Sequence, residues 1–473
     1  MSLVIMPDNS ELLLGIHSNS LSEATKSDKE VVDVLFECAR MKECLGLAAP
    51  AADASVLLTL DQSIVRLSYE DRGDGSFVAR REKERIGFHY SIPPSMIQDL
   101  YDCKEDSRKF REIKGAFLDL LAFEAISRWH KNESIFVSQS PHLLEKQVWI
   151  LARFDVKVLS FVQALEYFDL YLKRRDIYYV NPHITQVDGK AFDYWFLLKD
   201  LVPEFAEAWR TIIYGQKIIQ NAQNIQDGLA GLADRFQNAF CASDRISMEY
   251  MKRPVNSTEW EMLYNFNYFC MLATGIFDSL AWLTVYRYSI PVHHPIQVSI
   301  RVTTSKSKGT RFVKKISQHN SSLESLIKTQ QVLINLFYPM RDATQHREPV
   351  GGTQFVHSNE GWTASLARVK QDAAVAVQNI DQLGYPFTKW GLLKIAGIDY
   401  FLEPYRFSRQ ALRKLLTFTN EYLKLLDLPS LIASDRDMVK KIADARSKEP
   451  EPPFIARIYW RRDSHLPILF RNR

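Results

Sequence analysis

One long apolar segment, residues 266–286, constrains the fold of this chain more than any other feature of its sequence. It is about long enough to cross a lipid bilayer as a helix. The segment contains Asn267 and Asp278, however, and a carboxylate near the middle of a membrane span is costly. We therefore favour a helix buried in a bundle over a membrane-spanning helix, and we expect no membrane partner. Ser257 or Thr258 is predicted to cap its N-terminus.

Several segments within residues 201–430 have the apolar spacing of helices, and we predict an all-α domain there. Residues 321–324 (Ser-Ser-Leu-Glu) form a capping-box pattern, and Pro339 is expected to interrupt the helix that it opens. The other predicted helices cover residues 203–240, with a break near Gly228 or Gly231, residues 364–380 and residues 408–425.

Residues 1–181 are predicted to form a mixed α/β domain, followed by a linker at 182–200. Strands are expected at residues 11–16, 54–67, 76–79, 85–90, 134–138, 157–160 and 177–180. Helices are expected at residues 28–44, 106–129, 141–151 and 161–172. The strand-helix-strand alternation after residue 134 implies parallel strands joined by crossover helices. A basic tail, residues 431–473, contains a further predicted strand at 455–460.

Length and composition are those of a multidomain globular protein. The 473 residues should form two or three domains, and the hydrophobic fraction of 46% argues against extended disorder. The net charge of +4 is too small to indicate a nucleic-acid-binding protein by itself. The five cysteines include no CxxC pair, which argues against disulfides and a zinc site. Since no signal peptide is evident either, we expect a cytoplasmic protein without a cofactor.

The motif with the clearest chemistry is Arg341-Asp342-Ala343-Thr344-Gln345-His346, at the end of an apolar-periodic segment. RNA carries its own nucleophile, the 2′-hydroxyl group beside each phosphate. A metal-independent ribonuclease therefore needs a group that moves protons and a cation that stabilises charge on the phosphate. Histidine serves as a general acid or base near neutral pH, and arginine offers a planar fork to phosphate oxygens.

This pattern of an arginine, a polar residue, a short spacer and a histidine resembles the signature of HEPN ribonucleases. The resemblance implies that the helical domain is a HEPN-like bundle. With the α/β domain predicted from the residue patterns before it, the chain is expected to be an α+β multidomain protein. The resemblance also implies metal-independent RNA cleavage that leaves a 2′,3′-cyclic phosphate, in a cleft between two copies of the motif in a homodimer. Arg341 and His346 would be catalytic, Asp342 would orient them, and Arg347 would bind a second phosphate. Members of this family commonly act as toxins or in antiviral defence, so an antitoxin or other regulatory protein is a possible partner.

Two further groups of basic residues bear on this interpretation. Residues 301–315 contain no acid, and they are either a solvated loop or a phosphate-binding segment made of Lys308, Arg311, Lys314 and Lys315. Arg287 with His293 and His294 is an alternative match to the motif. It departs from the pattern because Tyr288, an aromatic residue, follows the arginine.

The N-terminal domain faintly resembles the C-terminal half of a PIN-like nuclease. Such nucleases hold a divalent metal with several carboxylates, one of them usually just after a late strand, but residues 138–140 are Ser-Gln-Ser here. Asp8, Asp119 and Glu124 remain as candidate acids. We therefore interpret this domain as a non-catalytic sensing or partner-binding module.

Two alternatives to the ribonuclease stay open. The chain is then either a non-enzymatic dimerisation, RNA-binding or partner-binding protein, or a metal-dependent nuclease that acts through its N-terminal domain.

Overall fold

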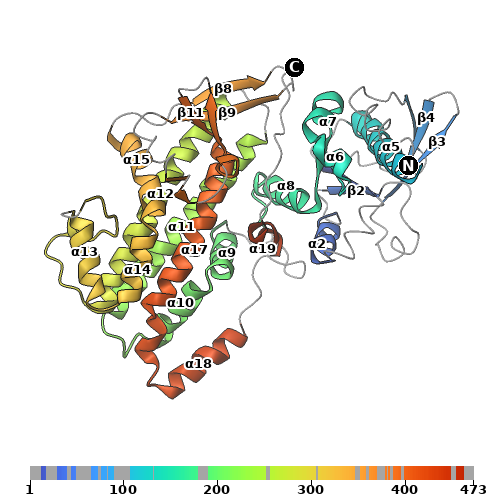
Figure 1. Cartoon of the computed structure of the whole chain (residues 1–473). Coiled ribbons are helices and arrows are strands. Elements are labelled where there is room, and N and C mark those ends of the chain that lie inside the picture. Colours follow the sequence, from blue (N-terminus) through green and yellow to red (C-terminus); the bar gives the residue numbers. More distant parts are fainter. Residues whose placement is uncertain are drawn as a thin grey trace. The chain divides into compact units, whose positions relative to one another are not determined.

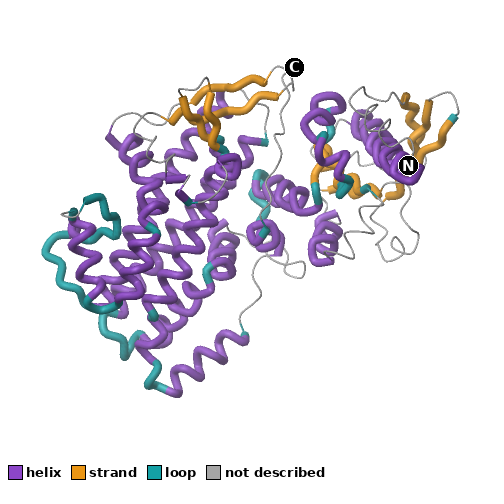
Figure 2. Tube along the Cα trace, viewed as in Figure 1, coloured by secondary structure: helices purple, strands orange, loops and turns teal. Residues whose placement is uncertain are grey.

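The computed structural model describes most of the chain and divides it into two compact units (Figures 1 and 2). Unit 1 comprises residues 1–177, 356–362 and 454–473, and unit 2 comprises residues 178–355 and 363–453. The described residues are 12–17, 29–39, 44–48, 65–72, 76–81, 84–89, 107–130, 133–178, 190–251, 256–304, 307–346, 352–357, 362–369, 379–380, 382–383, 387–395, 399–448 and 454–462. Together the elements make a mixed α+β protein, as the sequence predicts.

Unit 1 contains a seven-stranded sheet with the order β5-β4-β3-β2-β1-β6-β7. Its strands are β1 (Leu12–Ile16), β2 (Cys44–Ala48), β3 (Val65–Asp71), β4 (Ser76–Arg81), β5 (Glu84–His89), β6 (Glu133–Val137) and β7 (Lys157–Leu159). Strands β3, β2, β1, β6 and β7 are parallel to one another. Strands β4 and β5 extend the sheet beyond β3 as an antiparallel meander. The predicted parallel pairing of the strands near residues 134 and 157 is confirmed.

The central strands β1 and β6 are buried on both faces, and helices pack around them. These helices are α2 (Lys29–Ala39), α5 (Ser107–His130), α6 (Pro141–Glu145), α7 (Gln147–Phe154), α8 (Phe161–Lys173) and α19 (Phe454–Arg461). Gly15 of β1 lies against the ring of Phe123 in α5, where a Cβ atom would overlap the ring. Leu14 and Ile16 point to the other face, since successive strand residues alternate, and both are buried.

The C-terminal segment of unit 1 corrects one prediction. Residues 455–460 form helix α19 rather than a strand, and α19 packs on α8 and α2. Ile455, Ile458 and Tyr459 are all buried there, at the i, i+3 and i+4 spacing of one helix face. The strand predicted at 177–180 is not found at Ile177 or Tyr178, and its other residues lie outside the described part of the chain.

Unit 2 is built on a helical hairpin of α11 (Ala222–Tyr250) and α12 (Asn256–Tyr288). Gly228 packs against Leu283 and Gly275 packs against Arg235, so the two helices run antiparallel. Helices α15 (Gln331–His346) and α17 (Pro404–Leu426) pack on α12. The remaining helices are α9 (Lys190–Leu201), α10 (Pro203–Gly215), α13 (Lys308–Ser317), α14 (Ser321–Thr329), α18 (Arg436–Ser447) and the short η1 (Pro295–Gln297), η3 (Phe387–Trp390) and η4 (Leu428–Ile432).

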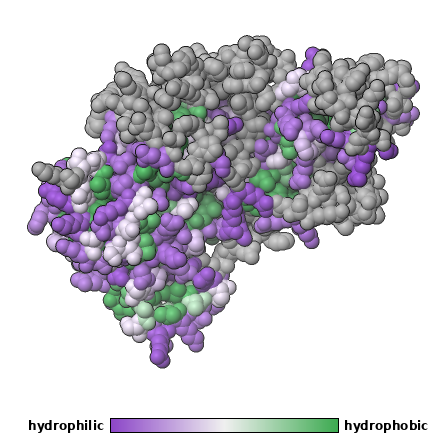
Figure 3. All heavy atoms as spheres, viewed as in Figure 1, coloured by the Kyte–Doolittle hydropathy of each residue, from purple (hydrophilic) through white to green (hydrophobic). Residues whose placement is uncertain are grey.

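Helix α12 contains the long apolar segment. Phe266, Phe269 and Phe277 are fully buried, and 67% of its most apolar stretch lies inside the protein. Among the described helices, α12 alone is long and apolar enough to cross a membrane by length and composition. In the view of Figure 3, the described surface of unit 2 is mostly hydrophilic, and its hydrophobic areas are small and separate.

Several boundaries in unit 2 differ from the predictions. Gly228 and Gly231 lie inside α11, and the break comes earlier, at residues 216–221. Part of the predicted linker forms α9, which packs on α10 and α11. Asn320 caps α14 in place of the predicted serine box, since its side chain accepts a hydrogen bond from the Leu323 amide.

The second domain is not all-α, because it contains a four-stranded sheet with the order β10-β11-β9-β8. These strands are β8 (Gly352–His357), β9 (Trp362–Val369), β10 (Leu392–Ile395) and β11 (Asp399–Leu402). Residues 364–369 of the predicted helix therefore form a strand. The helix predicted at 408–425 is confirmed as part of α17.

Candidate functional site

Arg341 and His346 lie on one continuous helix. Helix α15 runs through Pro339 to His346, so the predicted break before the motif is wrong. Residues five apart on a helix point roughly 140° away from each other around its axis. The two positions therefore lie on different faces of α15. His346 belongs to the helix, but its side chain and Arg347 lie outside the described part of the chain.

One face of α15 holds an extended segment, residues 300–302, alongside the helix. The Gln331 side chain accepts a hydrogen bond from the Val302 amide and donates one to the Ile300 carbonyl, both at 2.8 Å. One turn further on, Asn335 Oδ1 accepts from Arg301 Nε at 3.2 Å. These contacts direct the Arg301 side chain towards the C-terminal half of α15.

Tyr338 continues this face and lies beside two arginines. The Arg301 guanidinium carbon is 4.3 Å from the centre of the Tyr338 ring, and that of Arg341 is 5.7 Å from it. Arg301 Nη1 also lies 3.6 Å from Asp342 Oδ2. Asp342 is thus paired with Arg301, which the sequence did not single out. A polar stripe of Gln331, Asn335, Tyr338 and Asp342 at helical spacing is the sequence signal that marks this face.

Asp278 of α12 completes the cluster from the other side. The Tyr338 hydroxyl lies 3.4 Å from Asp278 Oδ1, at the long end of hydrogen-bond distances. Burial raises the pKa of the Asp278 carboxyl, and the charges of Arg341 and Arg235 oppose that rise. Arg301, Arg341 and Asp278 therefore lie around Tyr338, while Asp342 pairs with Arg301 and Arg235 of α11 acts on Asp278. We call residues 235, 278, 301, 338, 341 and 342 the arginine cluster. Its excess of positive charge suits a phosphate group.

From residue 308 onward, the basic stretch at 301–315 is helical and not a solvated loop. It forms α13, whose N-terminus is capped by the Ser307 side chain. Gly309 lies directly against the Arg301 carbonyl, where a Cβ atom would overlap the backbone. The same glycine therefore allows α13 to pack against the segment that carries Arg301.

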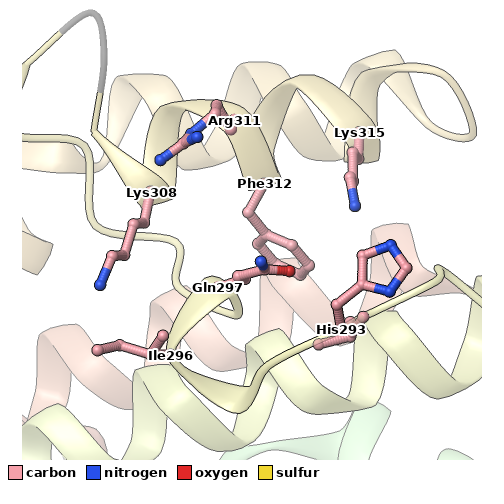
Figure 4. A pocket seen from close by; sticks show the side chains of 8 residues that line it. His293, Ile296, Gln297, Lys308, Arg311, Phe312 and Lys315 are labelled. Atoms are coloured by element: carbon pink, nitrogen blue, oxygen red, sulfur yellow. The ribbon is translucent and has the colours of Figure 1, made fainter.

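Helix α13 and the loop before it form a pocket of about 290 Å³ (Figure 4). Lys308, Arg311 and Lys315 line it, whereas the predicted Lys314 is exposed and does not. The other lining residues are Val292, His293, Ile296, Gln297 and Phe312. The structure thus gathers three of the four predicted phosphate-binding residues around one cavity.

The alternative motif match has structural roles instead. Arg287 donates hydrogen bonds to the Leu426 and Asp427 carbonyls and to Ser430 Oγ, at 3.3, 3.4 and 2.8 Å. It therefore satisfies carbonyls at the C-terminus of α17. His294 Nδ1 accepts a hydrogen bond from the Ile296 amide and closes the turn of η1. Only His293 of this group lines the basic pocket.

In unit 1, the edge where a PIN-like metal site is expected contains a different set of residues. His17 follows β1 and Ser138 follows β6, and His17 Nδ1 lies 3.2 Å from Ser138 Oγ. Asp119 Oδ2 lies 3.6 Å from His17 Nε2. Burial lowers the pKa of His17 to about 4 and raises the pKa of Asp119 to about 7. The site is therefore a buried, largely uncharged polar network.

The candidate acids of unit 1 do not form a carboxylate cluster in the described residues. Glu124 pairs with Arg128 on the same helix, and Asp8 lies outside the described residues. Burial raises the pKa of Glu124, and Arg128 opposes that rise. Within the described ranges, no three His, Cys, Asp or Glu side chains gather as metal ligands would.

Comparison with known proteins gives no relative from which a function can be transferred. No protein-family model matches the chain, and no curated protein and no solved structure matches it either. Its function is therefore inferred from the residues of the site.

Proposed function

We propose that unit 2 is a metal-independent endoribonuclease whose active site includes Arg341, Asp342 and His346. The observation that carries this proposal is the arginine cluster. It places Arg341 and Asp342 beside a second arginine, Arg301, on the helix that ends at His346. Such a concentration of guanidinium groups is suited to binding a phosphate diester and to stabilising its additional charge during cleavage.

In the proposed reaction, the 2′-oxygen of a ribose attacks the adjacent phosphorus atom. The bond from phosphorus to the 5′-oxygen of the next nucleotide breaks, and a 2′,3′-cyclic phosphate forms. His346 takes the proton of the 2′-hydroxyl as general base or gives a proton to the departing 5′-oxygen as general acid. Arg341 stabilises the negative charge on the phosphate oxygens, and Asp342 holds Arg301 in place beside it.

The proposed site is shared between two copies of the chain. Since positions 341 and 346 lie roughly 140° apart around a helix, the helical spacing alone does not bring them to the same phosphate in one chain. A two-fold homodimer resolves this, because Arg341 of one copy and His346 of the other can then face one phosphate. Arg347 would contribute a second phosphate contact.

A second candidate function is RNA binding without catalysis. The continuous helix through Pro339 favours it, because it places positions 341 and 346 on different faces of α15. Asp342 is also engaged in a pair with Arg301. In this case the arginine cluster binds phosphate groups but transfers no proton.

Replacement of His346 by alanine distinguishes the two functions. We expect the wild-type chain to cleave single-stranded RNA in the presence of EDTA, and His346→Ala to reduce the rate by about 10²- to 10⁴-fold, the usual contribution of a general acid or base. The rate is measured from the length of labelled RNA fragments. His294→Ala is the matched control, because His294 closes a turn, and this variant should keep the wild-type rate. Identical RNA patterns for wild type and His346→Ala would exclude the ribonuclease.

A further inference from the structure

The pocket between α13 and the loop at residues 292–297 has two chemically different parts (Figure 4). Lys308, Arg311 and Lys315 all come from α13 and supply positive charge. Phe312 and Ile296 together supply apolar surface. The residues that line the pocket include no carboxylate. A ligand that matches this lining has both an anionic group and a flat, apolar part.

The two ends of the pocket are set by the spacing along α13. Lys308 and Lys315 are seven residues apart, which is about 10 Å along a helix. In Figure 4, Lys308 lies at the end that contains Ile296, and Lys315 points towards His293 at the other end. Lys315 Nζ donates a hydrogen bond to the Pro291 carbonyl at 3.0 Å, so this lysine also fixes the loop against the helix.

The side chains that remain for a ligand are well suited to a nucleotide. Lys308 and Arg311 are exposed and flank one end, where they can bind a phosphate group. Gln297, beside Phe312, offers an amide that both donates and accepts hydrogen bonds, as the edge of a nucleobase requires. The volume of about 290 Å³ is at the small end of ligand pockets, which are roughly 300–1,000 Å³.

We propose that this pocket binds one nucleotide, with its phosphate group on Lys308 and Arg311 at the end that contains Ile296, and its base against Phe312 beside Gln297. The nucleotide is either free in solution or the 5′-terminal nucleotide of an RNA strand. Both sources present the same phosphate monoester and base. Binding here requires neither Arg341 nor His346, so it holds or fails independently of the proposed cleavage.

Equilibrium dialysis of the full-length His346→Ala protein with labelled adenosine 5′-monophosphate tests the pocket. We expect saturable binding, and a loss of affinity of about tenfold or more in Lys308→Ala/Arg311→Ala, since two charge-assisted hydrogen bonds are removed. Ile296→Ala should weaken binding less, because it removes only apolar contact. Lys314→Ala is the matched control, since Lys314 is an exposed lysine of the same helix outside the pocket.

The source of the nucleotide is identified by competition. A 5′-phosphorylated oligoribonucleotide that displaces the label better than its 5′-hydroxyl counterpart assigns the pocket to RNA ends, and displacement by adenosine 5′-monophosphate alone assigns it to a free nucleotide. Both results support the proposal. Absence of saturable binding at millimolar nucleotide would overturn it, and so would an equal loss of affinity in Lys314→Ala and in the double variant.

Discussion

Replacing Asp169 with alanine is expected to destabilise unit 1 by about 3–5 kcal/mol, the usual cost of removing one partner of a buried ion pair. Asp169 and Lys173 lie one turn apart on α8 with nearly all of their side chains buried, and Asp169 Oδ2 is 2.8 Å from Lys173 Nζ. The Tyr459 hydroxyl of α19 donates a hydrogen bond to the same oxygen at 2.7 Å. Loss of the carboxylate takes the partner from a buried ammonium group and also breaks the polar link between α8 and α19.

Hydrogen exchange of α8 peptides in the full-length protein measures this effect for unit 1 alone, since a two-unit chain need not unfold in one step. Tyr459→Phe is the matched control, because it removes one hydrogen bond, keeps the ion pair and should cost only about 1 kcal/mol. Equal exchange in Asp169→Ala and wild type would show that the pair does not stabilise unit 1, and that α19 does not dock on α8 in the way described.

His17 and Asp119 form a buried pair, and each should make the stability of unit 1 depend on pH in the opposite direction to the other. The pKa of His17 falls from 6.5 to about 4 on folding, so its contribution to stability rises with pH between about 4 and 6.5. The pKa of Asp119 rises from 3.8 to about 7, so its contribution falls between about 3.8 and 7. In the wild type, these two changes nearly cancel from pH 4 to 6.5.

When either group is removed, the pH dependence of the other is no longer cancelled. Asp119→Asn should leave unit 1 more stable at pH 6.5 than at pH 4, and His17→Gln should leave it less stable at pH 7 than at pH 4. Each change is on the order of 3 kcal/mol, from about 1.4 kcal/mol per pKa unit. The stability of unit 1 is measured by urea titration of the full-length variants at several pH values. Hydrogen exchange of peptides from β1 and β6 reports the unfolding of unit 1. Parallel pH profiles for both variants and the wild type would contradict the assignment of a neutral buried pair.

The β6–β7 part of the unit 1 sheet was predictable because its signals are local, whereas β2 (Cys44–Ala48) was not predicted and β3 (Val65–Asp71) only overlaps the strand expected at 54–67. Short apolar runs at 134–138 and 157–160 alternate with helical spacing, and that alternation by itself implies parallel strands. Residues 455–460 were predicted wrongly because a short apolar run fits either a strand or a helix, and only packing against α8 decides between them. The helix predicted at residues 364–369 was wrong for a related reason, because these residues form β9, and its pairing with β11 is a long-range contact.

The candidate site was predictable only in part. The sequence identified Arg341, Asp342 and the cations of α13 by residue type and spacing. It did not identify Asp278 or Arg301 as site residues, because long-range packing brings them to Tyr338: α12 packs on α15, and side chains of α15 hold residues 300–302. Arg235 was missed as well, since it acts on Asp278 from a separate helix, α11. Pro339 shows the limit of a local rule. It ordinarily disturbs a helix, yet α15 continues through it while Leu336, Phe337 and Met340 are buried around it.

Cleavage of a labelled oligoribonucleotide in EDTA, compared with cleavage of the same strand carrying 2′-O-methyl groups, tests most directly whether the 2′-hydroxyl is the nucleophile. We predict that the wild-type chain cleaves only the unmodified strand and leaves 2′,3′-cyclic phosphate ends, which mass spectrometry of the fragments identifies. His346→Ala should leave both strands intact. Cleavage of the methylated strand, or 5′-phosphate products that require added metal, would contradict the metal-independent site at Arg341 and His346.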